Sequence, residues 1–174
     1  MKQFFCLGSY TEPILFGTGE VFQGKGKGVS ICRFEDGLIE TVSTLSVRNP
    51  SFVCIDEERR KLYAVNEMKE YGGAFGGGVT QIGYSPDGGM RVEADFNTGG
   101  TDPCHIEIAP NGRFLSIANF ASGAVSVFAR DEAGNILRSG RDTAAGAKVA
   151  VSLGEGGFTC TVDTIIEKEA EGHG

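Results

Sequence analysis

The sequence contains no tryptophan, only five prolines and two histidines, and no apolar run long enough to cross a membrane as a helix. Lysine and arginine together number 16 against 23 aspartates and glutamates, which gives a formal charge of −7. Nucleic-acid binding is driven by basic side chains that release phosphate counterions, and an acidic membrane attracts a cationic face. We therefore expect neither a nucleic-acid partner nor a membrane partner.

The five cysteines are odd in number and widely spaced, and the sequence has no Cys-x-x-Cys or His-x-x-x-His pattern. This spacing argues against a zinc site and against a disulfide framework, so no metal is expected. The first residues, MKQFFCLGSYT, include one lysine and an apolar stretch too short for a signal peptide. We expect reduced, packed thiols in a cytoplasmic protein.

The sequence is rich in glycine, with 27 residues, and one of its segments occurs twice. Residues 51–67 read SFVCIDEERRKLYAVNE, and residues 104–120, which lie 53 positions further on, read CHIEIAPNGRFLSIANF. Each copy reads as an alternating strand, a polar turn and a second apolar strand that ends in asparagine, followed by a glycine-rich link and a third strand. A repeat of this length built of strands and turns predicts an all-β fold of propeller blades, each with four antiparallel strands.

The pattern predicts about three blades within residues 1–138, the first of them partial. The expected strands are 4–9, 29–34 and 38–44 in the first blade, 52–55, 62–66, 79–84 and 90–96 in the second, and 105–108, 114–119, 125–129 and a weaker 136–138 in the third. A hairpin turn at Glu35-Asp36-Gly37 and a turn at 85–89 are expected between strands.

Three blades do not close a ring, because propellers typically have four to eight. We therefore expect an incomplete ring, a fragment or an abbreviated member of a larger class, whose open blade edges favour self-association. The first blade lacks an innermost strand, which in a closed propeller normally comes from the far end of the chain. Residues 139–174 depart from the repeat, and we expect a divergent segment, a strand within 158–166 and a mobile charged tail.

Strand pairing predicts where polar side chains gather. The first two strands of a blade form a hairpin, so the start of the first lies beside the end of the second. His105 starts a first strand, Asn119 and Asn66 end second strands, and Glu67 follows Asn66. These four side chains are expected to converge on one mouth of the central channel, where propellers commonly bind ligands.

Seven short motifs, in order, resemble one known family. They are LGSYT, KGVSICRF, NPSF, LYAVNE, SPDGG, GTDPCHIEIAPNGRFLSIANF and SGAVSVF, which together span about residues 4–131. Their order is similar to that of the lactonase family of seven-bladed propellers, which includes the propeller-type 6-phosphogluconolactonases and fungal carboxy-muconate lactonizing enzymes.

The resemblance implies a cytoplasmic lactone hydrolase that converts 6-phospho-D-glucono-1,5-lactone to 6-phosphogluconate in the pentose phosphate pathway and needs no cofactor. A muconate-type lactonizing enzyme and a non-catalytic propeller scaffold for binding are the alternatives, because a fold does not fix a function.

Each candidate site residue has two interpretations. In a lactonase without a metal, His105 suits a general base because imidazole titrates near neutral pH, but it is equally a strand-end histidine bonded to backbone. Glu67 is either a base or sugar-orienting group, or a solvated loop carboxylate. Asn66 and Asn119 can donate to a substrate oxygen, but their recurrence at equivalent positions favours a structural role.

The cations are less informative. Lys25 and Lys27 lie in a glycine-rich loop at the same end as Asn66 and are candidates for phosphate contact, although a flexible solvated loop is the more ordinary interpretation. Arg60 and Arg113 are equivalent in the repeat, but both follow turns at the opposite end and are expected to be structural.

Overall fold

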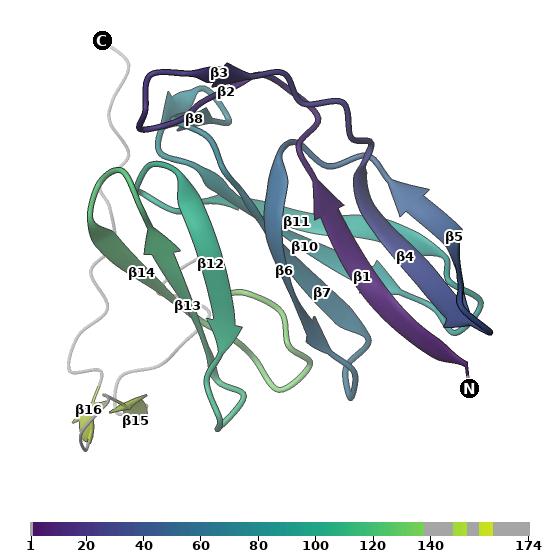
Figure 1. The fold of residues 1–174 in the computed structure, drawn as a ribbon. Helices are drawn as coiled ribbons and strands as arrows, with labels where there is room; N and C mark the ends of the chain where they lie inside the picture. The colour runs from purple at the N-terminus through teal and green to yellow at the C-terminus, as the bar shows by residue number, and fades with distance from the viewer. Residues whose placement is uncertain (1, 138–147, 153–156, 162–174) are drawn as a thin grey trace, which may run out of the picture.

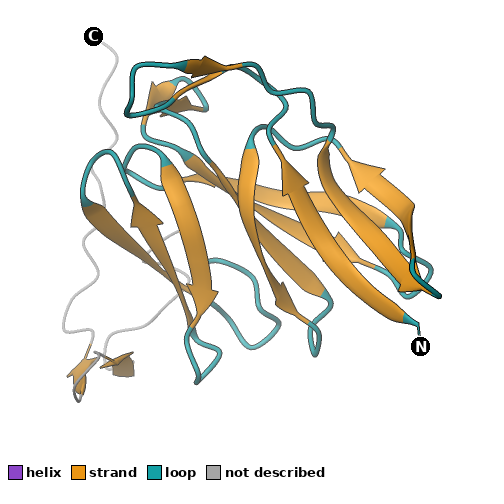
Figure 2. Ribbon diagram, in the orientation of Figure 1, coloured by secondary structure: helices purple, strands orange, loops and turns teal. Residues whose placement is uncertain are grey.

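The computed structural model describes residues 2–137, 148–152 and 157–161. Every regular element among these residues is a β-strand, and Figure 2 shows strands joined by loops and turns alone. This part of the chain accordingly contains no helix that could span a membrane. The long strands form three antiparallel sheets that follow one another along the chain and stand side by side as blades 1 to 3 (Figure 1). The predicted all-β blade architecture is confirmed.

Blade 1 contains β1 (Gln3–Ser9), β4 (Gly28–Glu35) and β5 (Leu38–Leu45), paired in the order β1-β4-β5. β4 and β5 are joined by Asp36 and Gly37, whose φ angles of 51° and 82° are those that a two-residue hairpin turn requires. The predicted hairpin is confirmed. Among the described residues, β1 pairs with β4 on one side and with no strand of its sheet on the other.

Blade 2 has the four antiparallel strands that the repeat predicted. They are β6 (Pro50–Asp56), β7 (Lys61–Asn66), β10 (Gly78–Tyr84) and β11 (Met90–Asn97), in the order β11-β10-β7-β6. The two middle strands are buried along almost their whole length, because blades 1 and 3 cover their two faces. Blade 2 is therefore the central layer of the described structure.

Blade 3 contains β12 (Pro103–Ile108), β13 (Phe114–Asn119) and β14 (Ala124–Ala129). The fourth strand predicted near residues 136–138 is reduced to a single bridge between Arg130 and Ile136, and residue 138 lies outside the described residues. The reason is local. The amide of Ile136 donates at 2.9 Å to the side chain of Gln81 in blade 2, which holds this segment against the neighbouring blade.

Three short hairpins were not predicted as such. Between the expected strands 4–9 and 29–34, β2 (Ile14–Leu15) pairs with β3 (Val21–Phe22), and between the expected strands 62–66 and 79–84, β8 (Glu70–Tyr71) pairs with β9 (Ala74–Phe75). Beyond residue 138, β15 (Lys148–Ser152) pairs with β16 (Gly157–Thr161). The predicted strand 158–166 overlaps β16, and its residues 162–166 lie outside the described part, as does most of the predicted divergent segment and tail.

Two apolar cores hold the blades together. The core between blades 2 and 3 contains seven buried side chains, and that between blades 1 and 2 contains five. The first comprises Tyr63, Val65, Val79, Ile106, Leu115, Ile117 and Ile136, and the second comprises Val29, Val47, Leu62, Ala64 and Ile82. Alternate residues of β7 therefore serve opposite cores, as the two-residue period of a strand requires.

Candidate functional site

One end of the three blades gathers the chain segments that the repeat predicted to meet there. Pro50 pairs with Asn66 and Pro103 with Asn119, so the starts of β6 and β12 lie beside the ends of β7 and β13. The β2–β3 and β8–β9 hairpins lie at this same end in Figure 1. We call this end the mouth, and the end that carries the β6–β7 and β12–β13 turns the base.

The two repeated asparagines are buried at the mouth. Asn66 is fully buried; its amide donates to the carbonyl of Arg48 at 2.7 Å, and its oxygen accepts from the Thr80 hydroxyl at 2.9 Å. Asn119 is 2% exposed and donates to Ser126 Oγ at 2.9 Å. These contacts support the structural interpretation of both residues and place neither amide where a substrate would meet it.

Glu67 is held at the mouth by blade 1. Its backbone amide donates to the carbonyl of Asn49 at 3.0 Å, and its Oε2 accepts a hydrogen bond of 2.8 Å from the Tyr10 hydroxyl. Burial, followed by this hydrogen bond and the negative charge of Glu67, raises the pKa of Tyr10 well above its ordinary value. Tyr10 therefore stays protonated throughout the physiological pH range. It donates a hydrogen bond to Glu67 and so fixes one oxygen of that carboxylate.

A pocket of about 280 Å³ opens next to Glu67. Its walls combine three charged side chains with apolar groups, namely Glu67, Lys69, Asp102, Leu15, Phe16, Gly17, Phe120 and Ala121. The β2–β3 hairpin supplies one wall, and the others come from the chain that follows β7 and β13 and from Asp102, which directly precedes β12. Concave sites of this kind, apolar with a few polar groups, are typical of small-molecule binding.

Asp102, one of the charged residues of the pocket, occupies a second position that recurs in the repeat. Asn49 and Asp102 lie 53 residues apart, each before the proline that starts an innermost strand, and both have positive φ (39° and 52°). The Asn49 oxygen accepts from the amides of Thr11 and Glu12 at 3.0 and 2.8 Å. Asp102, which is 5% exposed, instead binds the ammonium of Lys69 through Oδ2 at 2.5 Å.

His105 lies at the mouth but outside the lining of this pocket. It is exposed on β12, and its ring packs beside that of Phe52, its neighbour on the next innermost strand, with ring centroids 4.5 Å apart. Phe52 and His105 occupy equivalent repeat positions, and a break in strand register precedes each, at Ser51 and Cys104. Such bulges re-aim side chains and are frequent near active sites. The structure therefore places Glu67 in the pocket and His105 on the innermost strand beside Phe52.

Lys25 and Lys27 are exposed and make no ion pair with the described residues. The loop that carries them runs along blade 1, where the amide of Gly26 donates to the carbonyl of Tyr10 at 2.7 Å. Neither lysine lines the pocket beside Glu67. Their role in phosphate contact stays a prediction.

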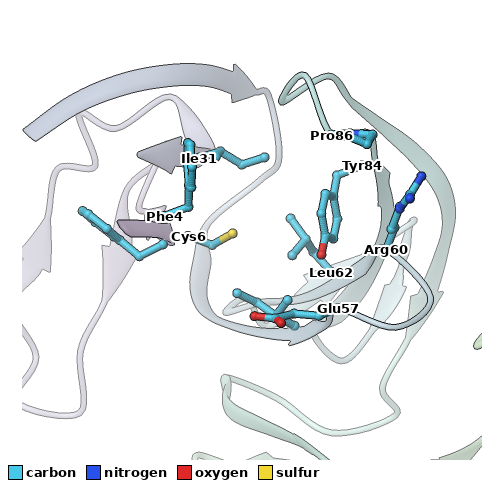
Figure 3. A pocket seen from close by; sticks show the side chains of 10 residues that line it. Phe4, Cys6, Ile31, Glu57, Arg60, Leu62, Tyr84 and Pro86 are labelled. Carbon is cyan, nitrogen blue, oxygen red and sulfur yellow. The ribbon is translucent and has the colours of Figure 1, made fainter. Parts of the chain in front are cut away.

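A second cavity, of about 350 Å³, lies between blades 1 and 2 toward the base. Figure 3 shows Phe4 and Cys6 of blade 1 on one side of it, and Leu62, Tyr84 and Arg60 of blade 2 on the other. Its lining is mostly apolar and lies far along the blades from Glu67. This location agrees with the expectation that Arg60 belongs to the end opposite the mouth.

Within residues 2–137 and the two short strands beyond them, no group of three or more His, Cys, Asp or Glu side chains is arranged to hold a metal ion. Cys6, Cys32, Cys54 and Cys104 are free thiols. Burial, the larger cause, and the nearby Cys32 raise the pKa of Cys6 to about 11. Burial also raises the pKa of Cys54 to about 12. Thiols with such raised pKa values are poor nucleophiles, so neither serves the mouth chemically.

A protein-family model described as a lactonase with a seven-bladed β-propeller matches residues 4–149. The chain belongs to this lactonase family. The blades described above are accordingly lactonase blades, and the resemblance in the ordered motifs is confirmed.

The chain is also similar to individual lactonases. The chain is 28% identical over 118 residues to a 6-phosphogluconolactonase of Formosa agariphila, an alignment that covers 65% of this chain and 32% of that protein. Its fold matches the crystal structure of a proposed 6-phosphogluconolactonase from Bacteroides uniformis, with 27% identity and a TM-score of 0.63 over 78% of this chain and 36% of that one. The periplasmic gluconolactonase of Pseudomonas aeruginosa shares the fold at 23% identity, with a TM-score of 0.65 over 79% and 37%. The chain spans about a third of the length of these relatives.

The pocket shows which residues the sequence argument missed. Tyr10, Lys69, Asp102 and Phe120 all contribute to the mouth, and none of them was a predicted site residue. A signal was present for two of them. Asp102 aligns with Asn49 in the motifs NPSF and DPCH, and Phe120 aligns with Glu67 in the same repeat.

Proposed function

We propose that the chain contributes to a lactone hydrolase whose substrate is a sugar lactone, in particular 6-phospho-D-glucono-1,5-lactone. Membership of the lactonase family and similarity to proteins named 6-phosphogluconolactonase support this proposal. The observation that carries it is the pocket at the mouth. This pocket is lined by the Glu67 carboxylate, which Tyr10 holds, by Lys69 and by aromatic side chains. The product would be 6-phosphogluconate, which places the reaction in the pentose phosphate pathway.

The proposed reaction needs a base, a proton donor and no cofactor. Water attacks the lactone carbonyl while the Glu67 carboxylate takes its proton, which leaves a tetrahedral oxyanion. The bond from the carbonyl carbon to the ring oxygen then breaks, and a proton donated by the His105 side chain converts the leaving alkoxide to a hydroxyl group. We assign the base to Glu67 rather than to His105 because Glu67 lines the pocket.

We also propose that the reaction takes place in the cytoplasm. Four free cysteines favour a reducing compartment over an oxidising one. Cell fractionation with an antibody to the chain tests this point. Recovery with cytoplasmic marker enzymes is expected, and recovery with periplasmic ones would contradict it.

The function is tested by following acid release from freshly prepared 6-phospho-D-glucono-1,5-lactone in a pH-stat, after subtraction of spontaneous hydrolysis. We expect His105→Ala to lower kcat by roughly 100- to 10,000-fold, the usual contribution of general acid–base catalysis. The matched control is His173→Ala, which removes the other histidine of the chain and should leave the rate unchanged.

Two outcomes would contradict the proposal. Turnover that is unchanged in His105→Ala would remove the assigned role of that residue. Lactone binding without any turnover above the spontaneous rate would identify the blades as a binding scaffold rather than an enzyme.

A further inference from the structure

The pocket beside Glu67 indicates which part of a lactone it accepts. We propose that it binds the uncharged, hydroxyl-bearing sugar ring and excludes the phosphate group. This inference rests on the proposed function for the identity of the ligand, but it concerns the pocket alone and is tested by binding.

The charges of the pocket favour a neutral ligand. Two carboxylates and one ammonium line it, and the ammonium of Lys69 is already bound by Asp102 Oδ2 at 2.5 Å. A phosphate group that entered would lie near Glu67 and would compete with a buried carboxylate for the Lys69 ammonium. Bringing like charges together and leaving Asp102 unpaired both disfavour such binding.

The two carboxylates of the pocket are hydrogen-bond acceptors. Asp102 Oδ1 has no hydrogen-bond partner among the described residues, whereas the equivalent oxygen of Asn49 accepts from two backbone amides. An ionised carboxylate only accepts hydrogen bonds, and a buried acceptor without a donor is costly. Asp102 Oδ1 is itself buried, so the acceptor that a sugar hydroxyl would meet in the pocket is the carboxylate of Glu67, whose other oxygen is held by Tyr10.

The apolar walls suit the carbon face of a sugar ring. Phe120 is 72% exposed at the rim, and an added Cβ on Gly17 of the opposite wall would lie in ordinary van der Waals contact with its ring, at 3.9 Å. Phe16 is held by edge and tilted contacts with Tyr10 and Phe22, at centroid distances of 6.3 and 6.0 Å. The pocket thus sets aromatic surface against hydroxyl acceptors, and both suit a polyhydroxylated ring.

Nuclear magnetic resonance titration of the full 174-residue chain tests the proposal. The probes are D-glucono-1,5-lactam, a stable uncharged analogue in which an amide replaces the ester, and inorganic phosphate. We expect the lactam to shift the amide signals of Gly17, Lys69 and Phe120, and phosphate to leave them in place. Shifts caused by phosphate at these signals, or the absence of shifts with the lactam, would overturn the proposal.

Two variants sharpen the test. Phe120→Ala should weaken lactam binding by about 3- to 10-fold, the range of a lost aromatic contact. Phe75→Ala removes an equally exposed phenylalanine, on β9 and outside the pocket, and should not affect it. Asp102→Asn should release Lys69 and allow phosphate to shift the pocket signals. Equal effects of Phe120→Ala and Phe75→Ala, or no gain of phosphate response in Asp102→Asn, would contradict the assignment.

This test is separate from that of the proposed function. A protein that binds the lactam in the pocket but hydrolyses no lactone would leave the inference intact and refute the enzyme. A protein that hydrolyses the lactone with unchanged rates in Phe120→Ala, and shows no lactam shifts at the pocket, would do the reverse.

Discussion

At the scale of single residues, a buried ion pair ties blade 2 to blade 3. Arg130, whose side chain is fully buried, donates to Asp56 at the end of β6 and lies over the ring of Tyr63, 4.9 Å from its centroid. Burial disfavours the charge of Asp56, but hydrogen bonds from Arg130 and Arg59, together with their positive charges, outweigh it and lower the pKa of Asp56. Asp56 is therefore important to the contact between blades rather than to the mouth.

Asp56→Asn should destabilise the chain by about 3 to 5 kcal/mol, because it leaves the Arg130 charge buried without a partner. Urea denaturation followed by circular dichroism measures the change in the free energy of unfolding. The control is Glu58→Gln, which removes the same charge two residues further on, at a side chain that is 81% exposed. A similar small effect of both substitutions would contradict the role of the pair.

The pH dependence of stability provides a second test of this residue. A carboxyl group with a lowered pKa in the folded state stabilises the fold above its ordinary pKa of 3.8, and this contribution is lost as the pH falls toward the folded value. The stability difference between the wild type and Asp56→Asn should therefore be full at pH 6 and shrink below about pH 4. A difference that stays constant down to pH 2 would show that Asp56 is not held in its ionised form.

At the scale of elements, the 131–135 turn after β14 takes the place of the predicted fourth strand of blade 3. The carbonyl of Gly134 accepts from the Tyr63 hydroxyl, and Asn135 Oδ1 accepts from the side chain of Gln81 at 3.0 Å, so blade 2 binds this turn through two side chains. Gly134 has a φ of 82° and is packed tightly: a Cβ there would lie 2.8 Å from atoms of both Arg130 and Arg59.

Gly134→Ala should cost at least about 1 kcal/mol more than Gly37→Ala. Both glycines have a φ of 82°, so both substitutions impose the same backbone strain of about 1 to 2 kcal/mol, but nothing lies within 4 Å of a Cβ at Gly37. Thermal and urea unfolding of the two variants measure the difference. Equal destabilisation would mean that the turn does not pack against blade 2 as described.

The long strands could be predicted because apolar and polar residues alternate along them and because the repeated segment shows the same pattern twice. The short hairpins could not, because two-residue strands such as β2 and β8 are too brief to show a period. The prediction of a fourth strand in blade 3 was wrong for another reason. Its apolar residue Ile136 packs in the core, but its backbone amide is taken by Gln81, a side chain from a different repeat.

At the scale of the whole molecule, the described blades leave apolar surface at both ends of the row. On β1, Phe4 and Leu7 are 59% and 52% exposed, and on β14 Val125 and Val127 are 72% and 58% exposed. Unpaired strand edges with apolar side chains favour pairing with another chain. Self-association through these edges is a prediction of this arrangement.

Sedimentation velocity over a range of protein concentrations tests this prediction. We expect the wild type to form larger species as the concentration rises, and Leu7→Lys to shift the distribution toward monomer, because a charge on an edge strand blocks pairing. Phe75→Lys places the same charge on β9, away from β1, and should leave the distribution unchanged. A wild type that is monomeric at all concentrations would contradict the prediction.

The mouth could be located from the sequence because hairpin pairing fixes which strand ends meet. Its chemistry could be predicted only in part. Glu67 was singled out because it follows the repeated asparagine. Lys69 and Asp102 belong to different repeats, and aligning the repeats does not show that the two residues are in contact. The asparagines themselves recur at the ends of second strands, where both are buried, which favours the structural interpretation.

The most direct test of the account compares kcat/KM for 6-phospho-D-glucono-1,5-lactone in Glu67→Gln and Glu107→Gln. Both substitutions exchange a glutamate for its amide, but Glu67 lines the pocket at the mouth, whereas Glu107 is exposed farther along β12. The account predicts a loss of roughly 100-fold or more for Glu67→Gln and wild-type values for Glu107→Gln. Equal values for the two variants would show that the mouth is not the site of hydrolysis.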